Sequence, residues 1–169
     1  MLERLRFDLV AVLLVATATA GCTSSDRVEG CTPPSNEAAL LDAYAKEPAI
    51  GVQPAASQRR EEPKRQPACR RVGKAVSRTS VSVQWDVRRN VNEQEIQGLY
   101  EAATIGTGWT AVPARSSVRY AQFCKSILGE RSILDLSWQD AVVLQSGDLV
   151  PGVVTVVVRA AGEAEASCP

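Results

Sequence analysis

The segment 79–87 alternates strictly between apolar and polar residues, and this pattern constrains the fold more tightly than any other in the chain. Its sequence, TSVSVQWDV, places Val81, Val83, Trp85 and Val87 on one side of an extended chain. Successive side chains of a β-strand point to opposite faces of a sheet, so a period of two predicts a half-buried strand. We expect this strand to be central, with Trp85 buried on its inward face.

A helix and three more strands are predicted after this strand. Residues 92–95, Asn-Glu-Gln-Glu, match the capping box that begins many helices, and apolar residues then recur at helical spacing as far as Gly106. These signals predict an amphipathic helix over 92–105. Residues 141–152 carry Ser-Gly-Asp and Pro-Gly and are expected to break the chain. Alternation, turn residues and a valine-rich run predict strands at 117–127, 131–138 and 153–159, the first two as a hairpin.

This order, β-α-β-β-β, predicts the α+β class. We expect a two-layer domain over residues 69–169, with the helix packed on one face of a mainly antiparallel sheet. The other face is expected to be partly solvated or covered by the segment that precedes the domain.

That preceding segment is rich in proline, with six of the nine prolines between residues 22 and 67. Proline donates no backbone hydrogen bond, so this stretch cannot form a central sheet. Within the arm, residues 36–68, the sequence NEAALLDAYAKEP predicts a short helix over 37–46, with Asn36 as N-cap and Pro48 as the stop. Residues 50–56 are expected to run in extended form along an edge of the domain, and residues 22–35 to form a flexible tether.

The first 22 residues have the layout of a secretory signal. Arg4 and Arg6 precede an uncharged run at 9–20, LVAVLLVATATA, and Gly21-Cys22 follows it. Twelve residues are too few to cross a bilayer core, which needs about 20. The small residues before Cys22 resemble the lipobox of bacterial lipoproteins, in which the cysteine thiol takes a diacylglycerol and the leader is cut before it.

The resemblance implies that residues 1–21 are a removed signal peptide and that Cys22 carries the acyl chains, palmitate among them. Two or three chains anchor a protein stably, so we expect the cell membrane, on its extracytoplasmic face, as the location. Thr19 stands where a lipobox usually has Leu, and Glu3 and Asp8 offset the leader's arginines. The alternative is an ordinary secreted protein cleaved after Ala20.

The cysteine count also indicates an oxidising compartment. Removing Cys22 from the five leaves an even number, which fits two disulfides: Cys31, Cys69, Cys124 and Cys168. Three pairings are open to four cysteines. We expect Cys69 to bond Cys124, since one precedes the first strand and the other lies in a strand expected nearby, and Cys31 to bond Cys168. No two of the four are spaced as C-x-x-C, so neither a redox dithiol nor a metal site is predicted.

Composition excludes several classes of function. The 19 basic residues balance the 19 acidic ones, which leaves nothing to attract a nucleic acid, and the chain has no His to serve as a general base or zinc ligand. We therefore predict no nucleic-acid partner, no cofactor, no catalytic residue and no enzymatic activity. Five carboxylates are candidates for an acid/base pair, but strand and helix-terminus positions explain most of them: Asp86, Glu93, Glu95, Asp135 and Asp140.

Eight basic residues gather between positions 59 and 78. This run is a candidate for attraction to anionic headgroups or cell-wall polymers, although we favour a solvated loop because the whole chain is neutral. Its members are Arg59, Arg60, Lys64, Arg65, Arg70, Arg71, Lys74 and Arg78.

Over residues 40–160 the pattern resembles the small lipid-anchored lipoproteins abundant in actinobacteria. The features that carry the likeness are the strand and helix order, the Gly-x-Gly-Trp at 106–109, the cysteine-bearing strand and the closing valine-rich strand. Those proteins mostly lack an assigned activity, so the resemblance implies an envelope location and no catalytic residue. We expect a non-enzymatic structural or protein-interaction module with an envelope protein or cell-wall partner. The alternative is a small-ligand-binding lipoprotein with an apolar groove beside Trp85, Trp109 and Trp138.

Overall fold

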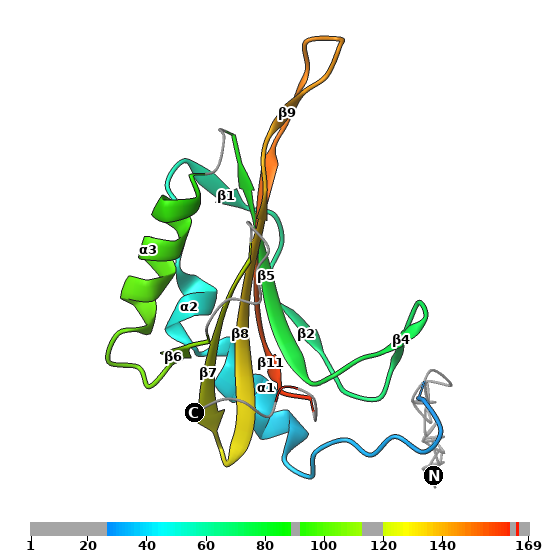
Figure 1. Ribbon diagram of the computed structural model, residues 1–169. Coiled ribbons are helices and arrows are strands. Elements are labelled where there is room, and N and C mark those ends of the chain that lie inside the picture. Colours follow the sequence, from blue (N-terminus) through cyan, green and yellow to red (C-terminus); the bar gives the residue numbers. More distant parts are fainter. Residues whose placement is uncertain (1–26, 89–91, 113–119, 163–164, 166–169) are drawn as a thin grey trace, which may run out of the picture.

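A computed structural model describes residues 27–88, 92–112, 120–162 and 165. The signal peptide, Cys22 and Cys168 lie outside these residues. The described chain is a mixed helix and sheet structure whose strands all pair antiparallel, so it belongs to the α+β class that the sequence predicts (Figure 1).

Four long strands form the body of the sheet, in the spatial order β5-β11-β8-β7. The last strand of the chain lies between the first and the third, with Val154 opposite both Trp85 and Trp138. β5 and β11 alternate between buried and partly exposed residues as their sequences predict, because one face is covered and the other is open. Their bounds are Ser80–Val87 for β5, Tyr120–Ile127 for β7, Glu130–Gln139 for β8 and Gly152–Ala160 for β11.

Short strands extend the two edges of this sheet. β1, Ser57–Arg59, and β2, Lys64–Gln66, both pair with the outer edge of β5, and β6, Thr110–Ala111, pairs with β7. The basic run therefore lies partly in edge strands instead of in one solvated loop. Edge positions suit it, since charged side chains there discourage pairing with other chains.

Two further hairpins project from the body (Figure 1). β3, Arg71–Val72, pairs with β4, Ala75–Val76, and β9, Val142–Val143, pairs with β10, Leu149–Val150. The second of these occupies the segment expected only to break the chain between β8 and β11.

The α3 helix, Glu93–Thr104, begins where the capping signal predicts. The Asn92 side chain accepts hydrogen bonds from the backbone N–H groups of Gln94 and Glu95, at 3.0 and 3.4 Å. These bonds satisfy two amides that have no partner within the helix. Ile96 and Tyr100 are buried against the sheet, and Gly106 takes a φ of 72°, the left-handed conformation that ends many helices.

The proline-rich arm packs on the same sheet face as α3. The α1 helix, Glu37–Ala45, and the α2 helix, Pro48–Gly51, bury Leu40, Tyr44, Ala49 and Ile50 in the common core (Figure 1). The expected extended run over 50–56 is therefore wrong at its start, because Pro48 begins a helical turn that buries Ile50. Asn36 stands at the N-cap position of α1 but makes no side-chain capping hydrogen bond.

Two tyrosine hydroxyls join the helices to their surroundings inside this core. The Tyr100 hydroxyl donates to the Val52 carbonyl at 3.0 Å, and the Tyr44 and Ser132 hydroxyls bond at 3.0 Å. Burial raises the pKa of both tyrosines, so both stay neutral and able to donate at physiological pH. Each bond satisfies a polar group that would otherwise be costly to bury.

Candidate functional site

The structure corrects the expected disulfide pairing. Cys31 bonds Cys69, with Cα atoms 5.4 Å apart. Residues before Cys31 run antiparallel to the segment after Cys69, with the Val28 N–H donating to the Cys69 carbonyl at 2.8 Å. The pairing of Cys69 with Cys124 is wrong because β11 and β8 lie between β5 and the strand β7 that carries Cys124. Cys31 is therefore not bonded to Cys168. Cys124 is buried in the sheet.

The three tryptophans belong to the core. Trp85, Trp138 and Trp109 are only 2%, 4% and 8% exposed, and all three pack in the same apolar cluster as the buried valines of β5 and β11. The prediction that Trp85 is buried on the inward face is confirmed. Rings this enclosed offer little surface to a ligand, so their burial does not support the groove considered above.

The predicted carboxylates are mostly engaged in ion pairs or local structure. Asp86 pairs with Arg60 at 2.7 Å, and Asp135 pairs with Arg159. Asp135 and Asp86 lie two strands and four register positions apart, a separation on the order of 15 Å or more. Paired catalytic carboxylates of glycosidases stand about 5–10 Å apart, so these two do not form such a pair. Among the described residues, no group of three His, Cys, Asp or Glu side chains is placed to hold a metal ion.

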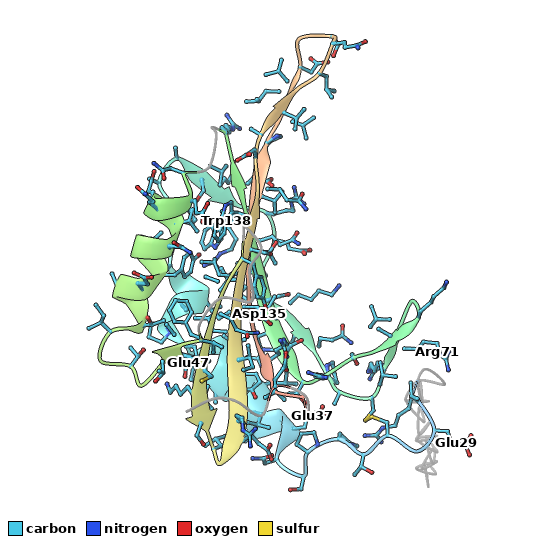
Figure 2. All side chains as sticks on the ribbon, in the orientation of Figure 1. Glu29, Glu37, Glu47, Arg71, Asp135 and Trp138 are labelled. Atoms are coloured by element: carbon cyan, nitrogen blue, oxygen red, sulfur yellow. A yellow bond between two sulfur atoms is a disulfide. The ribbon has the colours of Figure 1, made fainter. Side chains whose placement is uncertain are left out.

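Arg159 is the centre of a polar cluster on the face of the sheet away from the helices. Its guanidinium bonds Asp135 and, at 2.6 and 2.7 Å, the two carboxylate oxygens of Glu165. Tyr120 also donates to Asp135, which is labelled in Figure 2. The cluster ties β7, β8 and β11 to Glu165 near the end of the chain.

Mutual contacts shift the pKa values within this cluster. Hydrogen bonding from Arg159 lowers the pKa of Glu165 to about 2. Burial, followed by the bond to Asp135, raises the pKa of Tyr120 to about 12. Burial alone would lower the pKa of Arg159, but its two acidic partners outweigh burial and raise it. These shifts hold each group in its ordinary ionisation state at neutral pH, as structural ion pairs do, and leave no group poised to exchange a proton there.

A second ion pair joins α2 to the sheet on the helix side. Glu47, labelled in Figure 2, accepts from the Lys125 ammonium at 3.0 Å and from the Trp109 indole N–H at 2.9 Å. The ammonium also lies 5.5 Å from the centre of the Trp109 ring. The sequence analysis did not predict this contact, because Trp109 and Lys125 lie 62 and 78 positions after Glu47 in the chain.

Beside Lys125 the surface is hollowed by about 470 Å³, over the turn that joins β7 to β8. Its lining is polar and charged, with Ser126, Glu130 and Arg131 among its residues. The Lys125 ammonium in this lining already pairs with the Glu47 carboxylate, so the hollow does not by itself identify a ligand.

The β9–β10 hairpin is the feature that the fold itself does not explain. Its five large apolar side chains are all 45–68% exposed: Val142, Val143, Leu144, Leu149 and Val150. Scattered exposed apolar residues are ordinary, but a contiguous group marks an interaction site. The hairpin projects beyond the end of the sheet (Figure 1), and among the described strands each of its two pairs only with the other.

Both faces of this hairpin are apolar. Val143 lies opposite Leu149 in the register and Val142 opposite Val150, and adjacent residues of a strand point to opposite faces. A hairpin that lay flat on a partner would need only one apolar face. This hairpin exposes valine or leucine on each side, which suits insertion between two surfaces.

The base of the hairpin is closely packed at Gly152. A Cβ atom there would lie 2.6 Å from the Gln139 carbonyl oxygen and 2.8 Å from the Ala141 nitrogen. Only glycine allows the two strands to approach this closely, so β8 and β11 hold the hairpin at a defined position. The signal available in the sequence was two apolar runs flanking Gln-Ser-Gly-Asp at 145–148.

Comparisons with known proteins gave no match, whether to protein-family models, to curated proteins or to solved structures. Within the described ranges, no helix has both the length and the apolar character needed to cross a membrane.

Proposed function

We propose that this protein is a membrane-anchored lipoprotein of the cell envelope that acts as a non-enzymatic interaction module, with the β9–β10 hairpin as its contact with a partner protein. The anchor is the diacylglycerol on Cys22, at the extracytoplasmic face. The observation that carries the proposal is the projecting hairpin with apolar side chains on both faces.

The chemistry of the hairpin favours a protein partner over a lipid bilayer. Asp148 lies at its tip and Asp140 at its base, and residues 140–152 contain neither basic nor aromatic residues. Segments that insert into membranes carry Trp, Tyr, Lys or Arg at the interface, and a carboxylate at the leading tip opposes insertion. A slot with apolar walls, open at its far end to keep Asp148 hydrated, fits the hairpin better.

The orientation of the molecule supports the same choice. The described chain begins at Arg27, five positions after Cys22, beside the β3–β4 hairpin, whereas the β9–β10 hairpin projects from another part of the body (Figure 1). Five residues span at most about 18 Å, so the anchor stays near the β3–β4 end. The apolar hairpin is then held away from the anchoring membrane.

Photo-crosslinking tests the hairpin. A photoreactive amino acid in place of Val143 is expected to crosslink one envelope protein in intact cells. That protein, once purified, is expected to bind the native chain. Its affinity for the variant V143S/L149S is expected to be at least about tenfold lower, because the variant lacks two contact side chains. Ile105→Ser is the matched control, since Ile105 is 78% exposed on a different element.

Three results would overturn the hairpin assignment. They are crosslinks confined to lipid, crosslinks confined to a second copy of the chain, and unchanged affinity of V143S/L149S for the purified partner. Circular dichroism and thermal unfolding establish that the variant is folded, because exposed substitutions usually change stability by less than about 0.5 kcal/mol.

Intact-mass measurement tests the anchor separately. The mature chain is expected to begin at Cys22 and to carry two or three acyl chains, and Cys22→Ser is expected to release the protein from membranes or to stall the precursor. A mature chain without acyl mass contradicts the anchor and leaves the hairpin assignment standing.

A further inference from the structure

The basic run of residues 59–78 divides into two groups in the structure. Four of its arginines have ion-pair partners: Arg59 with Glu62, Arg60 with Asp86, Arg65 with Asp42 and Arg78 with Glu165. Arg70, Arg71 and Lys74, which belong to the β3–β4 hairpin and its base, have no ion-pair partner among the described residues, and neither does Lys64 on β2. Three of the four unpaired members of the run thus lie in one hairpin.

Arg27 adds a fourth positive charge to this hairpin. It forms a β-bridge with Arg70, and the Cys31–Cys69 disulfide fixes the N-terminal segment to the hairpin's base. Two acidic residues flank Arg27 in the same segment, Asp26 and Glu29. Counting both, the group carries two net positive charges.

The β3–β4 hairpin also exposes apolar side chains. Val72 and Val76 are 53% and 48% exposed, and Gly73 makes the tight turn with a φ of 61°. The hairpin stands away from the body of the sheet (Figure 1). Basic groups beside exposed aliphatic ones suit the headgroup region of a bilayer, where charge meets phosphate and methyl groups reach the upper acyl chains.

We propose that the β3–β4 hairpin, with Arg27, binds the anionic lipid headgroups around the anchor and so fixes the orientation of the protein on its membrane. This inference rests on the proposed function, since it takes the lipid to be on Cys22. Cys22 lies within about 18 Å of Arg27 along the chain, and the β-bridge and the disulfide join that segment to the hairpin. The hairpin is thereby kept within one or two Debye lengths of the headgroup charges.

Chemical labelling of Lys74 tests the contact. The lipidated full chain is reconstituted into phosphatidylcholine vesicles with or without 30% phosphatidylglycerol, acetylated under limiting reagent, and digested for mass spectrometry. Acetylation of Lys74 is expected to be about fivefold slower on the anionic vesicles, and 0.5 M NaCl is expected to remove the difference. Lys46, exposed at the end of α1, is the internal control and is expected to react equally on both.

The variant R70Q/R71Q tests whether the protection of Lys74 depends on the hairpin's charge or only on its closeness to the membrane. It keeps the disulfide and the anchor, so it is expected to react at Lys74 equally on both kinds of vesicle. Equal reaction of native Lys74 on both vesicles, or equal protection on both, overturns the proposal. Intact mass, measured on the same sample, reports the lipid on Cys22, so loss of the anchor and loss of the headgroup contact are read independently.

Discussion

Trp85 lies on β5, opposite Val154 of β11. The Arg59 guanidinium lies over its ring, 4.9 Å from the ring centre. Trp85 is buried on the face that all three helices cover. Truncation to alanine removes an aromatic ring that closely packed neighbours cannot replace. We therefore expect Trp85→Ala to lower the free energy of unfolding by about 3–5 kcal/mol in urea titrations. Ile105→Ala is the control, with a change within about 0.5 kcal/mol; equal effects would show that the ring does not support the core.

Glu165 makes stability depend on acid pH. Its pKa is lowered to about 2 by Arg159, from an ordinary value of 4.5, so the native state holds the carboxylate more strongly than the unfolded state does. That contribution is complete above about pH 4.5 and is lost as the pH falls through about 2. Urea unfolding is expected to show native protein about 1–3 kcal/mol more stable than Glu165→Gln at pH 6, allowing for the carboxylate's partial exposure, with the gap closing below pH 4. A gap that persists at pH 2 would mean that the ion pair is not its source.

At the scale of elements, the Cys31–Cys69 disulfide differs from the pairing expected from the sequence, because the sequence alone cannot select among the possible pairings. It closes a loop with a sequence separation of 38, for which chain entropy gives about 4 kcal/mol, an upper value because measured gains are often smaller. We expect C31A/C69A to unfold at lower urea than native protein while retaining the sheet by circular dichroism. Unchanged stability would contradict the bond, and peptide mapping without reduction would identify the pairing directly.

The elements that the sequence predicts are those with many repeats of one period. β5, β11 and α3 each carry enough alternating or helical positions to define a buried face, and a capping side chain marks the start of α3. Two-residue strands such as β9 and β10 have no period, and residues 141–152 therefore appeared only as a break. The candidate site lies in that segment, and its apolar residues stand outside the core cluster, so no core pattern marks them in the sequence.

Contacts between residues far apart in the chain also could not be predicted from the sequence. Glu47 meets Lys125 and Trp109 only because α2 turns onto the sheet, and the turn depends on Pro48 and on the burial of Ile50. Likewise, the ion pairs of the basic run depend on which acidic residues the fold brings close, as it brings Asp42 to Arg65 and Asp86 to Arg60. Sequence supplies the residue types, whereas the register decides which of them are neutralised.

For the molecule as a whole, the two projecting hairpins have different proposed roles, one in contact with the membrane and one in contact with a partner protein. The β3–β4 hairpin is basic and is bonded to the segment that leads from Cys22, and the β9–β10 hairpin is apolar and rooted in the two central strands. On the open face of the sheet between them, hydrogen bonds and ion pairs centred on Arg159 and Asp135 connect β7, β8 and β11.

If Cys22 carries the lipid as proposed, Cys124 and Cys168 are left for a second bridge, and Cys168 lies outside the described residues. With Cys31 bonded to Cys69, an even cysteine count in an oxidising compartment predicts a bond between Cys124 and Cys168. Cys124 lies opposite Ile133, which lies opposite Arg159, so it is two strand spacings, about 10 Å, from β11. The nine residues from Arg159 to Cys168 can extend about 30 Å, which is ample. Such a bond would tie the end of the chain to β7, the long strand farthest from β5.

Thiol titration of the mature protein, unfolded in guanidinium without reductant, is expected to detect no free sulfhydryl. Non-reducing peptide mapping is expected to find Cys124 joined to Cys168, and reduction is expected to release four thiols if the fifth cysteine carries lipid as proposed. Cys168→Ser should then leave one thiol, which maps to Cys124 and reacts slowly in the folded protein because the side chain is only 3% exposed. Two free thiols in the native protein, at 124 and 168, would show that the second bridge does not form and that ion pairs alone hold the end of the chain.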